Sequence, residues 1–261
     1  MKTLLVLLAI RVLCVGNSFS ADAMEQELIP MCTEAGVEVE VHNLYVGGCS
    51  LEKHARFLLN NDTSYAHRVC TNANPREVRG KISLREALQD GRYDYISLQQ
   101  VSHLSGVRAT YDPWLRMLMD TIKAYQPDAQ LCWMQTWAYS KDATHFGFPH
   151  YQNDQQLMYD SIVSCVRYVM SSSAYPLLLV PCGEAVQLGR QTSLGDTFCR
   201  DGYHLKYSYG RYIASAVWFE ILTGKNVRHL RYRNPKMSLK ERNLVQKAAH
   251  QAVKKVKNKL F

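Results

Sequence analysis

Five apolar segments rich in β-branched and aromatic residues alternate along the chain with segments of helical periodicity. The apolar segments are 11–16, 37–45, 93–99, 129–135 and 176–182. The helical segments are 21–35, 84–89, 114–125, 154–170, 207–222 and 238–260. Strands that alternate with helices favour parallel pairing through right-handed crossovers. The sequence therefore predicts an α/β protein, a three-layer α/β/α sandwich around a five-stranded parallel sheet.

The length and composition fit one domain over residues 1–261, with its core at about 11–224. The chain has 261 residues, of which 47% are hydrophobic, and it contains no linker-like tract and no internal repeat. We expect a flavodoxin-like strand order and assign the polar segment 46–80 to no strand. Ligands of such sheets bind beyond the carboxyl ends of the strands, so chemistry is expected there.

The net charge of +8 is concentrated at the C-terminus. Residues 225–261 hold twelve Lys or Arg against the single acid Glu241, so they carry +11 and residues 1–224 sum to −3. A basic segment of this kind can contact nucleic acid or anionic lipid, or it can be the solvated face of a helix. No aromatic residues for base stacking are interleaved with these basic residues. We favour the solvated helix and expect no nucleic-acid partner.

The N-terminus allows two interpretations. Met1 and Lys2 precede the apolar run 3–10, which resembles the start of a secretory signal, but no small-x-small cleavage site follows. The run continues into the first predicted strand and is too short to span a membrane. The protein is secreted or periplasmic if this is a signal and cytoplasmic if the strand begins early. The oligomeric state is not indicated.

A candidate nucleophile follows the first predicted strand. Gly16 permits a sharp turn, and Ser18 then precedes a helix whose first N–H groups have no partner within the helix. This position suits a serine nucleophile and the stabilisation of an oxyanion. The competing interpretation makes Ser18 a helix N-cap.

Two other strand ends carry residues that suit an oxyanion hole. Gly47 and Gly48 follow the second strand, where a glycine lets a backbone N–H approach a ligand closely. Gln99 and Gln100 end the third strand, and either could donate a side-chain N–H. Neighbours on a strand point to opposite faces, and we favour Gln99. The alternatives are a simple loop and a structural amide network.

Near the C-terminus, Asp201 and His204 form an Asp-x-x-His pattern in a predicted loop. The spacing allows the carboxylate to bond one ring nitrogen of the histidine and leave the other free to take a proton from a serine. Cys49 is a second candidate nucleophile, but no base lies beside it in sequence.

Taken together and in this order, the motifs at Ser18, Gly48, Gln99-Gln100 and Asp201-x-x-His204 resemble the GDSL/SGNH hydrolase superfamily. The chain is also similar to one branch of it, catalogued only as a domain of unknown function, in the strings GNSFS, LYVGGCSLEKH, SLQQVSHLSG and DGYHLKYSYGRY. The resemblance implies that Ser18 is the nucleophile of a Ser-His-Asp triad with His204 and Asp201. It also implies an oxyanion hole formed by the N–H groups of Ser18 and Gly48 and by a glutamine, as in sialate and xylan acetylesterases. Two departures are Asn17, where the superfamily has Asp, and Gln99-Gln100, where a G-x-N-D block is usual.

The predicted activity is ester hydrolysis that removes a small acyl group, such as acetyl, from a carbohydrate. We expect Trp137, Tyr139 and Tyr151 to stack on sugar rings at the rim of the site, with Asn17 also contacting substrate. The alternatives are core packing for the aromatic residues and a non-catalytic carbohydrate-binding module for the whole chain. No cofactor and no metal are predicted.

Overall fold

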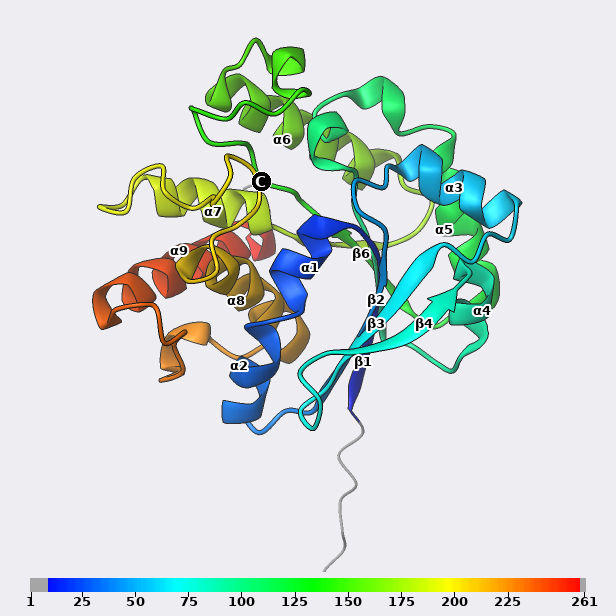
Figure 1. Ribbon diagram of the computed structural model, residues 1–261, viewed down its shortest axis with the longest axis horizontal. Helices are drawn as coiled ribbons and strands as arrows, with labels where there is room; N and C mark the ends of the chain where they lie inside the picture. Colours follow the sequence, from blue (N-terminus) through cyan, green and yellow to red (C-terminus); the bar gives the residue numbers. More distant parts are fainter. Residues whose placement is uncertain (1–8, 259–261) are drawn as a thin grey trace, which may run out of the picture.

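The computed structural model describes residues 9–258, and its centre is a seven-stranded sheet with helices on both faces (Figure 1). The strand order is β4-β3-β2-β1-β5-β6-β7. The strands are β1 (Ile10–Gly16), β2 (Val39–Tyr45), β3 (Tyr65–Cys70), β4 (Glu77–Ile82), β5 (Tyr95–Leu98), β6 (Gln130–Met134) and β7 (Leu177–Val180).

The five predicted strands are β1, β2, β5, β6 and β7, and neighbours among them pair in parallel. Their bounds differ from the predicted ones by no more than two residues. Their order is the flavodoxin-like one, which confirms the α/β class and brings their carboxyl ends to one edge of the sheet.

The predicted number of strands is wrong, because segment 46–80 adds two. It forms α3 (Leu51–Leu59) and then a hairpin, in which β3 pairs antiparallel with β2 and β4 pairs antiparallel with β3. Strand β4 lies at the edge of the sheet and is exposed along almost its whole length. An exposed edge strand needs no alternation of apolar and polar residues, so the sequence carries little signal for it.

Two groups of helices cover the faces of the sheet. Helices α1, α2, α7 and α9 pack around α8, and helices α3, α4 and α5 pack together on the other side, as Figure 1 shows. The α-helices are α1 (Ser18–Met24), α2 (Leu28–Glu34), α3 (Leu51–Leu59), α4 (Leu84–Gln89), α5 (Trp114–Tyr125), α6 (Gln155–Ser172), α7 (Cys182–Arg190), α8 (Tyr209–Thr223) and α9 (Leu239–Lys257). Segment 21–35, predicted as one helix, is therefore divided between α1 and α2.

The basic C-terminal segment is packed onto the rest of the protein. Ser238 and Glu241 form a capping box at the start of α9, where the sequence predicted a helix to begin. Val245, Ala249 and Val253 are buried on the side of this helix that faces α7 and α8. The lysines at 247, 254 and 257 are exposed, so the segment has a solvated basic face and a buried apolar one.

The N-terminal prediction falls largely outside the described residues, which begin at residue 9, although β1 does begin one residue earlier than expected. Among residues 9–258, no helix is both long enough and apolar enough to cross a membrane.

Candidate active site

The turn that presents Ser18 lies between β1 and α1. Asn17 is extended, with φ −140° and ψ −156°, and helix α1 begins at Ser18. A Cβ on Gly16 would lie 2.0 Å from Ser20 Oγ and 2.8 Å from Asn43 Oδ1, so only glycine lets the turn approach these side chains so closely. The half-buried Ser18 is thereby placed at the carboxyl end of β1.

Asn17 ties this turn to two other predicted parts of the site. Its Nδ2 donates to the Cys49 carbonyl (3.0 Å), and its Oδ1 accepts from Phe19 N–H (3.0 Å) and Gln99 Nε2 (2.7 Å). Asn17 is 1% exposed, so the expectation that it contacts substrate is wrong. Its side chain positions Ser18 instead.

The two glutamines have different surroundings. Gln99 is directed at Asn17, beside the Ser18 turn. Gln100 accepts from Leu51 N–H at its Oε1 and donates to the Thr110 carbonyl and hydroxyl from its Nε2. Because its amide is used by protein groups on another side of the strand end, Gln100 does not serve as an oxyanion donor, and that part of the prediction is wrong.

Within the described part of the chain, two backbone N–H groups near this turn have no protein partner. Gly48 is exposed with a φ of +61°, and neither its N–H nor that of Ser18 donates a hydrogen bond among residues 9–258. Cys49, the next residue after Gly48, is the one held by Asn17. Free N–H groups of this kind are what an oxyanion hole requires.

The Asp201 and His204 side chains are in contact, as their spacing predicted. Asp201 Oδ1 accepts the His204 backbone N–H (2.8 Å), and Oδ2 lies 2.7 Å from His204 Nδ1. Burial alone would raise the pKa of Asp201, but the hydrogen bonds from the His204 ring and from backbone N–H groups lower it below its usual range. An ionised Asp201 accepts a hydrogen bond from an Nδ1–H of His204, and this tautomer leaves Nε2 free to act as a base.

An acid that the sequence did not single out anchors this loop to α1. Asp22, one helical turn after Ser18, is 1% exposed and accepts the Leu205 backbone N–H at 2.7 Å. A second link is Trp137, which stacks on Phe19 at a centroid distance of 4.0 Å and donates its indole N–H to the Tyr203 carbonyl (2.7 Å). The only sequence signal for Asp22 was an acid within an otherwise largely apolar turn of helix.

The Ser18 hydroxyl and the His204 ring are brought to the same region without being hydrogen-bonded to each other in the described structure. The rings of Phe19 and His204 have centroids 6.2 Å apart. Bonds between nucleophile and base are often long in unliganded enzymes and shorten when substrate binds. The assignment of Ser18, His204 and Asp201 to catalysis stays a prediction.

The aromatic residues expected at the rim are in the interior. Trp137 and Tyr139 are 0% exposed, and Tyr151 is 2% exposed. Tyr139 hydrogen-bonds Ser102 Oγ (2.8 Å), and Tyr151 donates to the His103 carbonyl (3.0 Å). These side chains pack the core beneath the loop after β6, so the prediction that they stack on sugar rings is wrong.

Cys49 does have a histidine beside it, supplied by α3. Its Sγ lies 3.4 Å from His54 Nδ1, which also bonds the Tyr65 hydroxyl (2.8 Å). Burial raises the pKa of the Cys49 thiol to about 12 and lowers the pKa of His54 to about 3. Both groups are therefore neutral at pH 7, and the thiolate that a cysteine nucleophile needs is not formed.

Burial of His54 makes the stability of the protein depend on pH. Below about pH 6.5 the unfolded chain binds a proton at this imidazole that the native protein, with its pKa of about 3, does not bind. Stability is therefore lost as the pH falls, and we expect this residue to cost about 2 kcal/mol on going from pH 8 to pH 5. Urea unfolding of the wild type and His54→Asn at both pH values measures the difference. The exposed His150→Asn is the control, and equal pH dependence in wild type and His54→Asn would contradict the assignment.

A group of metal-ligating residues lies away from the Ser18 turn. Ligand atoms of His42, His67 and Asp90 are within 4.8 Å of one another. The two rings are hydrogen-bonded to each other at 2.8 Å, and His42 Nε2 is 2.7 Å from Glu40 Oε1 and 3.3 Å from an Arg11 guanidinium. Both ring nitrogens of His42 are already hydrogen-bonded to other side chains. The prediction of no metal stays a prediction.

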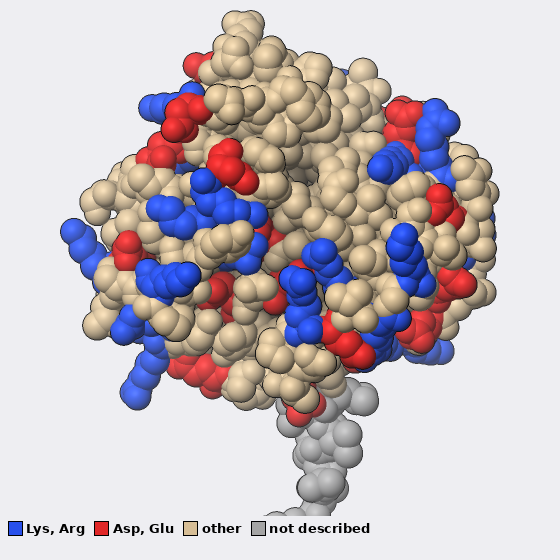
Figure 2. Space-filling view, viewed as in Figure 1, with Lys and Arg blue, Asp and Glu red and all other residues tan. Residues whose placement is uncertain are grey.

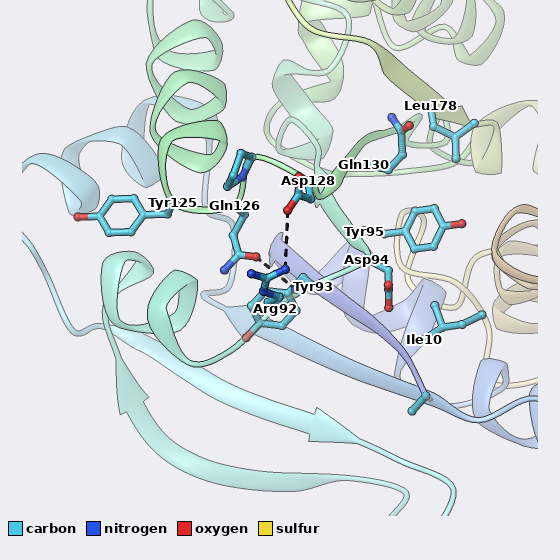
Figure 3. A pocket seen from close by; sticks show the side chains of 12 residues that line it. Ile10, Arg92, Tyr93, Asp94, Tyr95, Tyr125, Gln126, Asp128, Gln130 and Leu178 are labelled. Atoms are coloured by element: carbon cyan, nitrogen blue, oxygen red, sulfur yellow. Dashed lines mark hydrogen bonds and ion pairs between the residues drawn. The ribbon is translucent and has the colours of Figure 1, made fainter. Parts of the chain in front are cut away.

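A cavity of about 700 Å³ lies at the opposite end of the sheet. It is bordered by Ile10, Tyr95, Gln130 and Leu178, at or near the amino ends of four strands, as Figure 3 shows. The Arg92–Asp128 ion pair at its mouth spans 3.9 Å between side chains that are 93% and 88% exposed. Ligands of parallel sheets bind at the other ends of the strands, so we assign the chemistry to the smaller site beside Ser18.

The sequence profile described as Domain of unknown function (DUF4886) matches residues 11–252. The chain belongs to this family. The match extends past residue 224, the expected end of the domain core, and includes most of α9. No curated protein matches the chain in sequence.

Solved structures support both the family and the fold. A DUF4886 family protein from Bacteroides uniformis is 37% identical, with a TM-score of 0.91 over 94% of this chain and 95% of that one. A protein from Slackia heliotrinireducens, proposed to be an SGNH hydrolase, is 22% identical (TM-score 0.57; 82% and 98% covered). A carbohydrate esterase family 3 protein from Talaromyces cellulolyticus is 11% identical (TM-score 0.53; 83% and 97% covered). This DUF4886 protein therefore has the SGNH-hydrolase fold.

Proposed function

We propose that this DUF4886 protein is a serine ester hydrolase with Ser18 as nucleophile, His204 as general base and Asp201 as the group that orients His204. The proposal rests above all on one loop: it holds His204 Nδ1 2.7 Å from Asp201 and is anchored through Leu205 to the helix that begins with Ser18. An Asp–His contact in a loop that is tied to a strand-end turn presenting a serine is the arrangement that acyl transfer uses.

In the proposed reaction, His204 Nε2 takes the Ser18 proton as Oγ bonds to the ester carbonyl carbon. The carbonyl electrons move to oxygen, and the N–H groups of Ser18 and Gly48 donate to this oxyanion. Gln99 Nε2 donates to it through its second N–H, since the first is bonded to Asn17. The tetrahedral intermediate then expels the alcohol, which receives the proton from His204. Water, activated by the same ring, releases the acid from Ser18. Each oxyanion donor is worth about 10²–10³ in rate.

We propose a small acyl group, such as acetyl, carried by a carbohydrate. The cavity that borders Ser18 is about 120 Å³ and is lined mostly by charged side chains, which suits a small polar substrate better than a lipid chain. Similarity in fold to a carbohydrate esterase supports the sugar. Trp137, Tyr139 and Tyr151 do not support a sugar substrate, because their side chains are buried. The alternative of a sugar-binding module without activity loses the same support.

Covalent labelling tests the nucleophile directly. Incubation with a fluorophosphonate probe should form an Oγ–P bond at Ser18, with fluoride leaving from phosphorus and the hydroxyl proton passing to His204. Mass spectrometry of the digested protein should place one adduct on the peptide that contains Ser18.

Heat-unfolded protein is the control, because an unfolded chain cannot activate the serine and should stay unlabelled. An adduct at another residue, or none on folded protein, would overturn the proposal.

A further inference from the structure

The cavity beside Ser18 is lined by four arginines from four different parts of the fold. We call it the arginine pocket, formed by Arg68 of β3, Arg76 of the β3–β4 connection, Arg200 of the loop before His204 and Arg211 of α8. Figure 2 shows basic side chains on both sides of the region over α1, with carboxylate atoms between them. Convergence of four guanidinium groups on a nucleophile needs a physical reason, because like charges repel.

Two buried acids account for part of this charge. Asp22 accepts from Arg200 Nη1 (3.1 Å) and Arg211 Nε (2.8 Å). Glu25, 3% exposed, lies 3.3 Å from Arg68 Nη1 and 3.7 Å from Arg76 Nη1.

Four positive charges against these two carboxylates leave a net charge of +2 at the pocket. A third carboxylate, Asp201, lies 4.0 Å from Arg200 Nε outside the lining of the pocket, and counting it leaves a net charge of +1.

The arginines also carry more donors than the protein uses. A guanidinium has five N–H groups. Arg68 donates to protein only through Nη1, and the Arg76 side chain donates no hydrogen bond among the described residues. Neutralising two buried acids does not require these remaining donors, so they are available to a ligand.

Aromatic stacking holds the guanidinium groups in place. Arg68 lies over the Tyr45 ring at 3.3 Å from its centroid, and Arg200 and Arg211 both lie over the Tyr207 ring, at 4.5 and 4.4 Å. A guanidinium that is already held loses little freedom on binding, and its planar donors match the oxygens of a carboxylate, sulfate or phosphate. The cavity of about 120 Å³ has room for about four waters, the space that such a group needs.

We propose that the arginine pocket binds an anionic oxygen group of the substrate, so that the esters hydrolysed at Ser18 belong to acidic sugars. This inference rests on the proposed esterase function, because it gives the substrate a charge beside the ester group. A carboxylate, a sulfate and a phosphate share the chemistry that the arginines recognise.

The kinetic test uses one acetylated sugar in four forms. Acetylated methyl glucoside is the neutral parent, and its uronate, 6-sulfate and 6-phosphate are the acidic forms. Acetate release should give at least one acidic form a kcat/KM about ten-fold or more above that of the parent. The preference should weaken with added salt, because ions screen the attraction.

Arg76→Gln is the informative variant, because the Arg76 side chain is 46% exposed and its one ion pair with residues 9–258 is long, at 3.7 Å. It should lower the ratio of acidic to neutral kcat/KM about ten-fold, and Arg76→Lys should restore part of the ratio. The matched control is Arg92→Gln, which removes the same charge from a side chain that is 93% exposed at the far end of the sheet and should leave the ratio unchanged. Equal kcat/KM for all four esters, or an unaltered ratio in Arg76→Gln, would overturn the inference.

Direct binding separates this inference from the esterase proposal. Calorimetric titration of the wild type with methyl glucuronoside, inorganic sulfate and inorganic phosphate should show one of them binding, and Arg76→Gln should weaken it about ten-fold. Binding without hydrolysis of any ester supports the pocket and refutes the esterase. Hydrolysis that depends on Ser18, with no anion bound and no acidic preference, refutes the pocket alone.

Discussion

Ser18→Ala is expected to lower the kcat for p-nitrophenyl acetate by about 10⁴-fold or more, the scale of loss seen when serine hydrolases lack their nucleophile. The alanine removes the oxygen that would form the acyl-enzyme, while the helix that begins at this residue keeps its backbone and its Asn17 cap. Initial rates for both proteins, with circular dichroism to verify that each is folded, measure the effect.

Ser171→Ala is the matched control, since it makes the same change at an exposed position near the end of α6 and should leave kcat unaltered. Equal rates in wild type and Ser18→Ala would remove Ser18 as the nucleophile. A sugar-binding role without catalysis would then be the better account of this site.

Asp201→Asn is expected to lower kcat by up to about 10⁴-fold while leaving the protein folded. The new side chain still offers an oxygen to the backbone N–H of Tyr203 and His204. Its amide nitrogen replaces Oδ2 at 2.7 Å from His204 Nδ1, and an N–H there donates to the ring. The ring proton then moves to Nε2, which can no longer accept the proton of Ser18.

The control for this change is Asp142→Asn, an exposed acid in the neighbouring loop after β6. It should retain the wild-type kcat. If Asp201→Asn keeps its kcat within about ten-fold of wild type, Asp201 does not orient the base as proposed. An unfolding experiment on each variant separates a lost contact from a lost fold.

The sequence determined those features that depend on neighbours along the chain. The strands of the parallel sheet were predictable because buried strands read as continuous apolar runs between helices with a regular apolar period. The contact of Asp201 with His204 was predictable because three residues of spacing place both groups on one turn. Ser18 was singled out because Gly16 and a helix start follow directly from the local residues.

The exposure of the aromatic side chains depends on tertiary packing, and the prediction made from the sequence was wrong. Trp137 and Tyr139 follow the end of a strand, where the polar loop suggested an accessible rim, yet both are 0% exposed. Trp137 is covered by Phe19, a residue more than a hundred positions earlier in the chain. Hydrophobic burial depends on which distant surfaces come together. The sequence around an aromatic residue near a strand end therefore does not indicate whether its side chain is buried or exposed.

Three further features depend on the tertiary structure and could not be predicted from the sequence. They are the different surroundings of Gln99 and Gln100, the anchoring of the His204 loop, and the arginine pocket. Asp22 reaches Leu205 across a separation of 183 residues, and Arg211 reaches Asp22 across 189. Contacts at such separations leave no periodic pattern in the chain. The sequence by itself therefore determined the α/β fold and the order of the Ser, Asp and His candidates, because local periodicity and turn spacing encode them. Only the folded chain decided which polar groups face the serine, because each one there is held by a partner from another part of the sequence.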